Sequence, residues 1–311
     1  MVSVSEIQKR FDILFQEIRK VIVGQDQVMK EILVALLCDA HALLESYPGL
    51  AKTLAIKTLS QTLDLQFSRI QSTPDLLPAD IIGTYIIDES KGKKQFTFQQ
   101  GPIFANMVLV DEINRATPKS QSALLEAMQE RQITTGNNTF KLDDPFFVLA
   151  TQNPIEQAGT FPLPEAQSDR FLLKIKLTYP PFEDEMEIVE RYATGKQIQM
   201  PKKVFNKENL KYLQNLTRQV PMSNDLKKYT VSVVTATRNR GDLIEYGASP
   251  RASIGLILAA KAMALIEGHK CVMKEDIIRM AYSVLRHRII LTFEAEKNNI
   301  TEDDVIKELL E

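Results

Sequence analysis

The sequence contains little of what several classes of protein require. Its 311 residues include two cysteines, three histidines and no tryptophan. Metal sites built from His and Cys usually take four ligands from one cluster, so these numbers argue strongly against such a centre. The 12 glycines and 14 prolines are too few for a low-complexity or collagen-like chain. With 44% hydrophobic and 25% charged residues, the composition is that of an ordinary globular protein.

Charge of one sign and long apolar runs are also lacking. Lys and Arg number 38 against 40 Asp and Glu, so no global basic field is present for nucleic acid or an anionic membrane. The longest apolar runs, 32–38 and 254–260, fall far short of the ~20 residues of a spanning helix. The N-terminus lacks the apolar region of a signal peptide. We expect a soluble cytoplasmic protein without membrane insertion, with Cys38 and Cys271 as free thiols.

The first part of the chain alternates between apolar and helical segments. Short, fully apolar strands separated by helices indicate a parallel sheet covered on both faces. The expected strands are residues 41–44, 66–70, 107–110, 146–150 and 171–177, and helices are expected at 26–40 and 54–63. The sequence therefore predicts an α/β fold.

Two segments interrupt this alternation, and the composition then changes. Residues 83–99 and 132–142 each read as a hairpin, the second around Gly136-Asn137-Asn138. After Pro180-Pro181 the pattern predicts helices only, over 183–193, 207–219, 225–239, 250–267, 274–285 and 301–310. We expect an α/β domain over 1–180 and an all-α domain over 181–311.

Residues 45–53, Glu-Ser-Tyr-Pro-Gly-Leu-Ala-Lys-Thr, lie between the first strand and a helix. This is the context of a phosphate-binding loop, in which backbone N–H groups at a helix N-terminus face the phosphates. Lys52 would reach the β- and γ-phosphates, and the hydroxyl of Thr53 would bind Mg²⁺. A plain helix N-cap is the alternative interpretation.

This loop departs from the usual pattern at both of its glycines. Ser46 and Ala51 occupy the two glycine positions, so Gly49 is the one glycine inside the loop. The methyl group of Ala51 is tolerable if its φ is negative. Ser46 requires a wider turn or distorts the loop.

The third expected strand ends in two carboxylates, Asp111 and Glu112. In phosphate-loop enzymes the first acid holds Mg²⁺, and the second polarises the attacking water as a general base. A solvated strand end is the alternative. Asn153 follows the fourth strand and could hold both the attacking water and a γ-phosphate oxygen. The dipeptide Asn153-Pro154 is equally typical of a turn.

Several arginines are candidates for binding an anion. Arg170 directly precedes the fifth strand and could act as an arginine finger towards a neighbouring subunit, or form an ion pair with Asp169. Arg251 lies in the first turn of a helix capped by Ser249, where a cation opposes the dipole, so an external anion is a reasonable partner. Arg115 and Arg131 are lesser candidates, both readable as helix-surface charges.

Together these segments resemble the MoxR family of AAA+ ATPases, over nearly the whole chain. The matching segments are Ile-Val-Gly-Gln (22–25), Pro-Gly-Leu-Ala-Lys-Thr (48–53), residues 69–78, Gly-Pro-Ile-Phe-Ala-Asn (101–106), Asp-Glu-Ile-Asn-Arg-Ala (111–116), Ala-Thr-Gln-Asn-Pro (150–154), 161–171, Gly-Ala-Ser-Pro-Arg-Ala (247–252) and Val-Leu-Arg-His-Arg (284–288). Ala51 agrees with the family, whereas Ser46 and Ser168 depart from it.

The resemblance implies a core sheet of order 5-1-4-3-2, a helical lid and a ring-shaped homo-oligomer, most often a hexamer. It implies ATP and Mg²⁺ between subunits, with Lys52, Thr53, Asp111, Glu112 and Asn153 acting in cis. Arg170 looks like the finger acting in trans, and Arg251 like the second sensor, in cis or in trans. Contacts to ATP are implied at Gly24, Gln25, Ser46, Tyr47, Pro48, Gly49, Leu50, Ala51, Lys52, Thr53, Leu54 and Arg251.

The resemblance also implies a function, and two alternatives stay open. Family members act as chaperone-like motors that remodel or activate protein partners, often proteins with von Willebrand factor A domains. A nucleic-acid motor is the first alternative, but the second hairpin has only Arg131 and Lys141 near its arms, so we do not expect a nucleic-acid partner. A nucleotide-binding scaffold with little turnover is the second alternative, supported by Ser46 alone.

Overall fold

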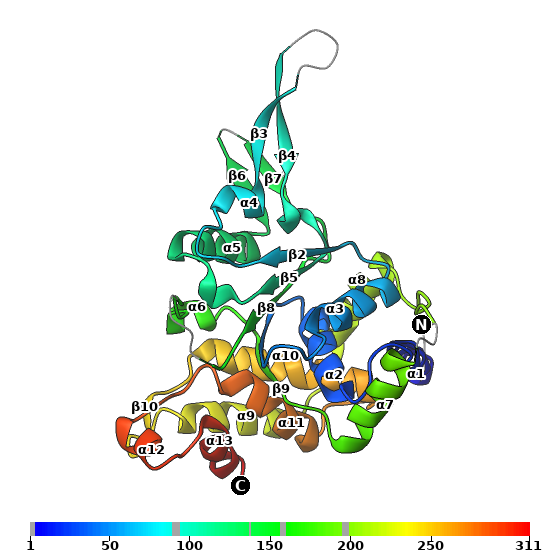
Figure 1. Ribbon diagram of the computed structural model, residues 1–311. Helices are drawn as coiled ribbons and strands as arrows, with labels where there is room; N and C mark the ends of the chain where they lie inside the picture. Colours follow the sequence, from blue (N-terminus) through cyan, green and yellow to red (C-terminus); the bar gives the residue numbers. More distant parts are fainter. Residues whose placement is uncertain (1–3, 89–93, 137, 156–159, 195–198) are drawn as a thin grey trace.

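A computed structural model describes the chain apart from residues 1–3, 89–93, 137, 156–159 and 195–198. Its centre is a five-stranded parallel sheet of order β2-β5-β8-β1-β9 (Figure 1). The strands are β1 (Ala42–Ser46), β2 (Phe67–Gln71), β5 (Met107–Asp111), β8 (Phe147–Gln152) and β9 (Leu173–Leu177). Counted along the chain, this order is 5-1-4-3-2, so the α/β fold and the implied sheet order are confirmed. The observed bounds differ from those expected by one or two residues.

The two faces of the sheet are buried in separate hydrophobic clusters, because alternate residues of a strand point to opposite sides. Leu44 and Leu109 belong to the first cluster, whereas Leu43 and Val108 belong to the second. Helices α1 (Val4–Arg19), α2 (Asp26–Leu37) and α3 (Lys52–Thr62) contribute to the first cluster, and α4 (Pro78–Ile82) and α5 (Pro118–Glu130) to the second. Helix α2 ends three residues before the expected position 40.

Both expected hairpins are present and project together from one end of the molecule (Figure 1). The first consists of β3 (Gly83–Asp88) and β4 (Gln95–Gln100), and the second of β6 (Gln132–Thr135) and β7 (Asn138–Lys141). The ring of Phe98 stacks on that of Phe140 with centroids 4.5 Å apart, and Asn138 donates a hydrogen bond to the Tyr85 hydroxyl. The two hairpins therefore support each other. The tip of the first and Asn137 of the second lie outside the described residues.

The C-terminal part is mainly helical, as expected, but it also contains a small sheet. Its helices are α7 (Phe182–Ala193), α8 (Lys207–Gln219), α9 (Asn224–Ala236), α10 (Pro250–Glu267), α11 (Lys274–Leu285), α12 (Phe293–Lys297) and α13 (Glu302–Leu310). Strands β10 (Ile244–Tyr246) and β11 (Ile290–Leu291) pair antiparallel, so the expectation of helices only was wrong. Segments of three and two residues are too short to show the alternation that marks a strand in a sequence.

Helix α10 joins the C-terminal helices to the core. It contacts α1 and α2 as well as α8, α9 and α11. Residues of α10 and α11 belong to the same hydrophobic cluster as those of α1, α2 and α3. Domains over 1–180 and 181–311 stay a prediction, with Tyr179-Pro180-Pro181 lying between β9 and α7.

Both cysteines are free thiols as expected, Cys38 buried and Cys271 exposed. Across the described ranges, no helix combines the length and the apolarity that crossing a bilayer requires. The cytoplasmic location stays a prediction.

Candidate functional site

A cavity of about 460 Å³ lies at the carboxyl ends of the parallel strands, the edge where open α/β sheets bind ligands. Its lining comes from the loop between β1 and α3, from β2 and from the end of β5. The lining residues are Pro48, Gly49, Leu50, Ala51, Lys52, Thr53, Leu54, Arg69, Gln71, Asp111 and Glu112. The structure thus brings together the expected phosphate loop and the expected acidic pair.

The loop reaches helix α3 through two residues in the left-handed region. Gly49 has a φ of 82° and Ala51 a φ of 55°, so the negative φ that would make the methyl group of Ala51 easy to accommodate is not observed. A side chain in this region costs roughly 1–2 kcal/mol, and residues held this way gather at ligand-binding sites. Ser46 is not among the residues of positive φ; it is buried in β1 and donates its hydroxyl to the carbonyl of Tyr47. The strand accommodates Ser46 without the glycine conformation.

Lys52 is the first residue of α3, and its ammonium group lies in the cavity with the two acids. Its Nζ donates to the carbonyl oxygen of Tyr47 at 3.4 Å. Burial lowers the pKa of Lys52, and the charges of Asp111 and Glu112 oppose this shift. Thr53 follows in the first turn of the same helix. The N-terminus of α3 therefore presents a cation, a hydroxyl and a positive dipole end to one space.

Both acids of the pair are held by arginines. Asp111 is buried at the end of β5, and its Oδ2 accepts a hydrogen bond from Nε of Arg69 at 2.6 Å. Glu112 has a φ of 53°, and its Oε2 accepts from Nη1 of Arg115 at 2.9 Å. Arg115 lies in a short 3-10 helix with a side chain 40% exposed, so its interpretation as a helix-surface charge is compatible with this pair, and Arg131 forms an ion pair with Asp39. Arg69 was missed, because its spacing from Asp111 in the sequence reveals nothing of their contact.

Thr151 is a second residue that sequence reasoning missed. Its side chain is fully buried at the end of β8, the strand next to β5. Its Oγ1 accepts the backbone N–H of Glu112 at 2.9 Å and lies 3.4 Å from Oδ1 of Asp111. The Thr151 hydroxyl thus contacts both acidic residues, Glu112 at its backbone N–H and Asp111 at its carboxylate.

Asn153 lies one residue beyond β8, where the sequence places it. Its Oδ1 accepts the backbone N–H of Ile155 at 3.1 Å, which is the turn contact of the alternative interpretation. It is not among the residues lining the cavity. A role for Asn153 in holding water stays a prediction.

A smaller, apolar cavity of about 200 Å³ adjoins the first, with Ala51 and Leu54 lining both. Its other walls are Val21, Ile22, Val23, Gln25, Ile188 and Tyr192. The hydroxyl of Tyr192 donates to the carbonyl of Val21 at 2.6 Å, which fixes α7 against the N-terminal segment. Five of these residues were not expected at the site, since their types are ordinary core residues: Val21, Ile22, Val23, Ile188 and Tyr192.

The remaining expected ATP contacts hold these walls together. Gln25 donates from Nε2 to the carbonyl of Leu50 at 3.2 Å. Gly24 has a φ of 71°, and a Cβ built there would lie 2.2 Å from a carboxylate oxygen of Asp184 on α7. Tyr47 stacks on Tyr179 with ring centroids 5.2 Å apart. The N-terminal segment, the phosphate loop and α7 are therefore in mutual contact.

The two expected trans or sensor arginines lie away from this cavity. Arg170 is exposed and lines a separate cavity of about 470 Å³ beside α5, with its Nη1 3.3 Å from the carbonyl of Leu125. The alternative Arg170–Asp169 ion pair is not observed: Asp169 pairs with Arg288 at 2.7 Å and with Arg251 at 3.4 Å. Ser249 caps α10 as expected, but Arg251 has Asp169 as a partner within the chain.

Comparisons with known proteins agree with this geometry. Residues 41–173 match the family model described as the ATPase family associated with various cellular activities, and residues 236–309 match the AAA lid domain. Chaperone MoxR1 of Mycobacterium tuberculosis is 46% identical, over 95% of this chain and 79% of that protein. Protein YeaC of Bacillus subtilis is 41% identical, over 95% and 91%.

A solved structure is similar over the whole fold. A crystal structure of a protein from Cytophaga hutchinsonii superposes with a TM-score of 0.92 at 44% identity, covering 99% of this chain and 95% of that one. The core sheet, the helical lid and the identity to MoxR1 lead to one assignment: the chain belongs to the MoxR family of AAA+ ATPases.

Proposed function

We propose that the protein binds ATP across the two adjoining cavities and hydrolyses it. The observation that carries this proposal is the division of the site into a polar and an apolar cavity that adjoin each other. The larger cavity holds Lys52 and the N-terminus of α3 for the phosphates. The smaller one is apolar and of a size for a nucleobase, which would lie between Ile22, Val23 and Tyr192. The two share Ala51 and Leu54, so one nucleotide can span both.

The residues present also fit a magnesium ion. Mg²⁺ prefers hard oxygen ligands and is usually held by one or two protein groups together with the phosphates. The hydroxyl of Thr53 and the carboxylate of Asp111 face the same cavity. When bound, the ion neutralises charge on the β- and γ-phosphates. Arg69 now contacts Asp111, so we propose that it withdraws when the carboxylate takes the metal.

Glu112 is the proposed general base, which accepts the proton of the attacking water. Its backbone N–H is fixed by Thr151, while its carboxylate is bound by Arg115. Arg115 contacts Oε2 of Glu112, so the proton would go to Oε1. Asn153 would hold the water from the next strand.

We propose a ring, most simply a hexamer, because the cavity lacks two of the arginines that the family resemblance implies. Arg170 is exposed and Arg251 has a side chain 65% exposed, and neither lines the cavity of its own chain. In a ring, Arg170 would reach the nucleotide of the neighbouring subunit and stabilise charge on the transferring phosphoryl group. Arg251 would act as second sensor in cis or in trans.

The proposed work is chaperone-like remodelling or activation of a protein partner, which includes proteins with a von Willebrand factor A domain. Support comes from MoxR1, which is named a chaperone, and from the net charge of −2, which offers little to nucleic acid. The projecting hairpins offer a surface for a client (Figure 1).

The Glu112→Gln variant tests the hydrolysis assignment. We expect Mg²⁺-dependent ATP turnover to fall by roughly 100-fold or more, as for loss of a general base, with nucleotide affinity retained. Glu208→Gln, at an exposed position in the first turn of α8, is the matched control and should leave turnover unchanged. Unchanged turnover in Glu112→Gln contradicts the assignment. If the wild-type protein binds ATP to saturation but does not hydrolyse it, the result supports the nucleotide-binding scaffold. If DNA strongly stimulates ATP turnover, the result supports the nucleic-acid motor.

A further inference from the structure

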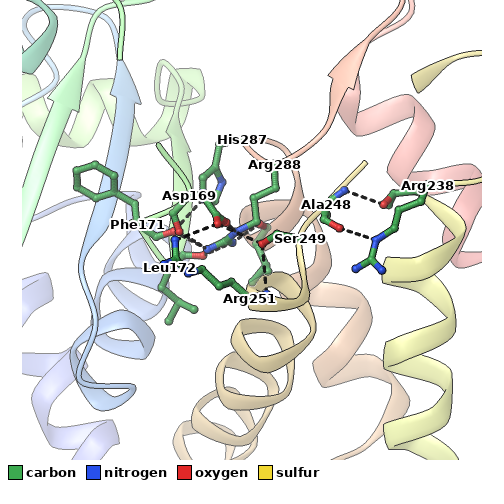
Figure 2. A network of polar contacts seen from close by, with 11 residues as sticks. Asp169, Phe171, Leu172, Arg238, Ala248, Ser249, Arg251, His287 and Arg288 are labelled. Carbon is green, nitrogen blue, oxygen red and sulfur yellow. Dashed lines mark hydrogen bonds and ion pairs between the residues drawn. The ribbon is translucent and has the colours of Figure 1, made fainter. Parts of the chain in front are cut away.

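The segment that carries Arg170 is held from both sides by one guanidinium group (Figure 2). Nε of Arg288 donates to Oδ1 of Asp169 at 2.7 Å. Its Nη2 donates to the carbonyl of Phe171 at 2.7 Å, and its Nη1 to that of Leu172 at 2.9 Å. Arg288 thus binds the residue before Arg170 and the two after it, while Arg170 itself is left exposed.

Arg288 belongs to the lid, in the turn between α11 and β11. Its side chain is only 3% exposed, and burial lowers its pKa while Asp169 opposes the shift. A charge buried this way is expensive unless it is paired and hydrogen-bonded, and the planar fork of arginine serves several acceptors at once. The adjacent His287 donates from Nε2 to the same carbonyl of Phe171 at 2.9 Å.

Asp169 is bound by a second part of the lid as well. The Ser249 hydroxyl donates to its Oδ2 at 3.1 Å, and Arg251 lies 3.4 Å from the same oxygen. The turn before Ser249 is fixed within the lid, because Nε of Arg238 donates to the carbonyl of Ala248 at 2.8 Å (Figure 2). Two separate lid segments therefore converge on one carboxylate beside Arg170.

We propose that Arg288 is a positioning residue for Arg170: it fixes the segment 169–172 to the lid, so that the position of the lid sets the position of the arginine offered to the neighbouring subunit. This inference rests on the proposed trans role of Arg170. Its consequence is directional. Through this contact, a shift of the lid segment that carries Arg288 in one subunit changes hydrolysis at the site of the next subunit.

The Arg288→Lys variant is the first test. Lysine keeps the charge that Asp169 requires but cannot serve the carbonyls of Phe171 and Leu172 at the same time. A small misplacement of a catalytic group can cost about 100-fold in rate, so we expect kcat to fall about 10- to 100-fold, with the nucleotide Kd within about threefold of wild type. Arg288→Ala is the stronger variant, used where its melting curve shows a folded protein.

Arg286→Lys is the matched control. Arg286 lies on the same turn and is 10% exposed, but it donates to the carbonyl of Lys174 inside β9 and pairs with Asp303 of α13. It does not contact the segment 169–172 in the described structure. We expect this control to leave kcat unchanged, which separates loss of the Arg170 contacts from general weakening of the turn.

Mixed oligomers decide between positioning in trans and damage to the subunit's own site. Glu112→Gln subunits cannot hydrolyse ATP but keep Arg170 and Arg288 intact. Mixed with Arg288→Lys subunits, they should restore turnover at the sites of the Arg288→Lys subunits, because an intact Arg170 then reaches those sites. Arg170→Ala mixed with Glu112→Gln should be restored in the same way.

Each result has a defined meaning. Rescue of both mixtures supports the positioning role. Rescue of Arg170→Ala but not of Arg288→Lys, or an unchanged kcat in Arg288→Lys, overturns the inference and leaves the proposed function standing. No rescue of Arg170→Ala, in mixtures shown to co-assemble, overturns the trans role of Arg170 and the inference with it. If the wild-type protein shows no ATP turnover, the proposed function itself is overturned.

Discussion

Nε of Arg69 on β2 lies 2.6 Å from Oδ2 of Asp111 at the end of the neighbouring strand β5. The carboxylate is buried and the guanidinium is about half exposed. The guanidinium of Arg69 thus contacts the carboxylate that we propose as a magnesium ligand. If Asp111 binds Mg²⁺ as proposed, the metal and the guanidinium of Arg69 would compete for this carboxylate.

Removing Arg69 should therefore make the metal easier to bind. For Arg69→Ala, we expect the Mg²⁺ concentration at half-maximal ATP binding to fall by about 3- to 10-fold, since no cation competes for Asp111. Titration of nucleotide affinity against Mg²⁺ measures this. Arg10→Ala is the control, because this exposed arginine of α1 does not line the cavity. If the Mg²⁺ concentration at half-maximal ATP binding is unchanged or higher in Arg69→Ala, Arg69 does not compete with the metal for Asp111.

Thr151→Val should impair both stability and turnover. The valine leaves the N–H of Glu112 without the acceptor it now has at 2.9 Å. A buried donor left unsatisfied costs about 1–3 kcal/mol of unfolding free energy, and the carboxylate of Asp111 loses its contact with the hydroxyl. Urea denaturation and steady-state ATP turnover measure the two effects. Thr151→Ser keeps the hydroxyl and should recover most of both, and a failure to do so would point to the methyl group instead.

Gly24→Ala should weaken nucleotide binding through the wall of the apolar cavity. Its φ of 71° disfavours a side chain, and the new Cβ meets Asp184 of α7. A strain of about 1 kcal/mol corresponds to about a fivefold loss of affinity, measured by calorimetry with ATP. Gly241→Ala is the control, because a Cβ there has open space and no positive φ. Equal effects of the two changes would exclude a local cause.

The pH dependence of stability should carry a contribution from His41. Its Nδ1 accepts the N–H of Val148 and its Nε2 faces the carbonyl of Met128. Burial lowers the pKa of His41 to about 4. The unfolded chain titrates near 6.5, so it binds more protons than the folded chain between these values. Stability is then lost as pH falls below 6.5, by about 2 kcal/mol on reaching pH 5.

His41→Gln provides the check. An amide can accept from Val148 and donate to Met128 without titrating. Denaturation at pH 7 and pH 5 should show a smaller difference in the variant than in the wild type. Burial also lowers the pKa of His287. This residue therefore contributes to the pH dependence of stability that remains in the variant. An identical pH dependence in both proteins would contradict the assignment to His41.

Sequence reasoning located the sheet and the phosphate loop because their signals are local. A run such as Met107–Asp111 is apolar enough to indicate a buried strand, and Gly49 with Lys52 and Thr53 marks the loop before a helix. The strand order came from the family resemblance. Composition does not determine which strands are neighbours.

The contacts that the sequence did not reveal are long-range ones. Arg69 meets Asp111 across 42 positions, Thr151 meets Glu112 across 39, and Arg288 meets Asp169 across 119. Each depends on which strands and turns lie side by side, and no spacing rule links such partners. The positive φ of Ala51 could not be predicted for another reason, because the loop imposes it against the residue's own preference.

The two hydrophobic clusters lie on the two faces of the sheet, and the first of them continues past Pro180-Pro181 into the C-terminal helices. Helices α10 and α11 of the lid share their cluster with α1, α2 and α3, whereas α5 and the segment next to the hairpins belong to the other. The lid helices α10 and α11 and the N-terminal helices therefore share one hydrophobic core, and the hairpin end of the molecule packs on the other. Cleavage of the chain at residue 180 would therefore leave α10 and α11 attached to the N-terminal helices through their common hydrophobic core.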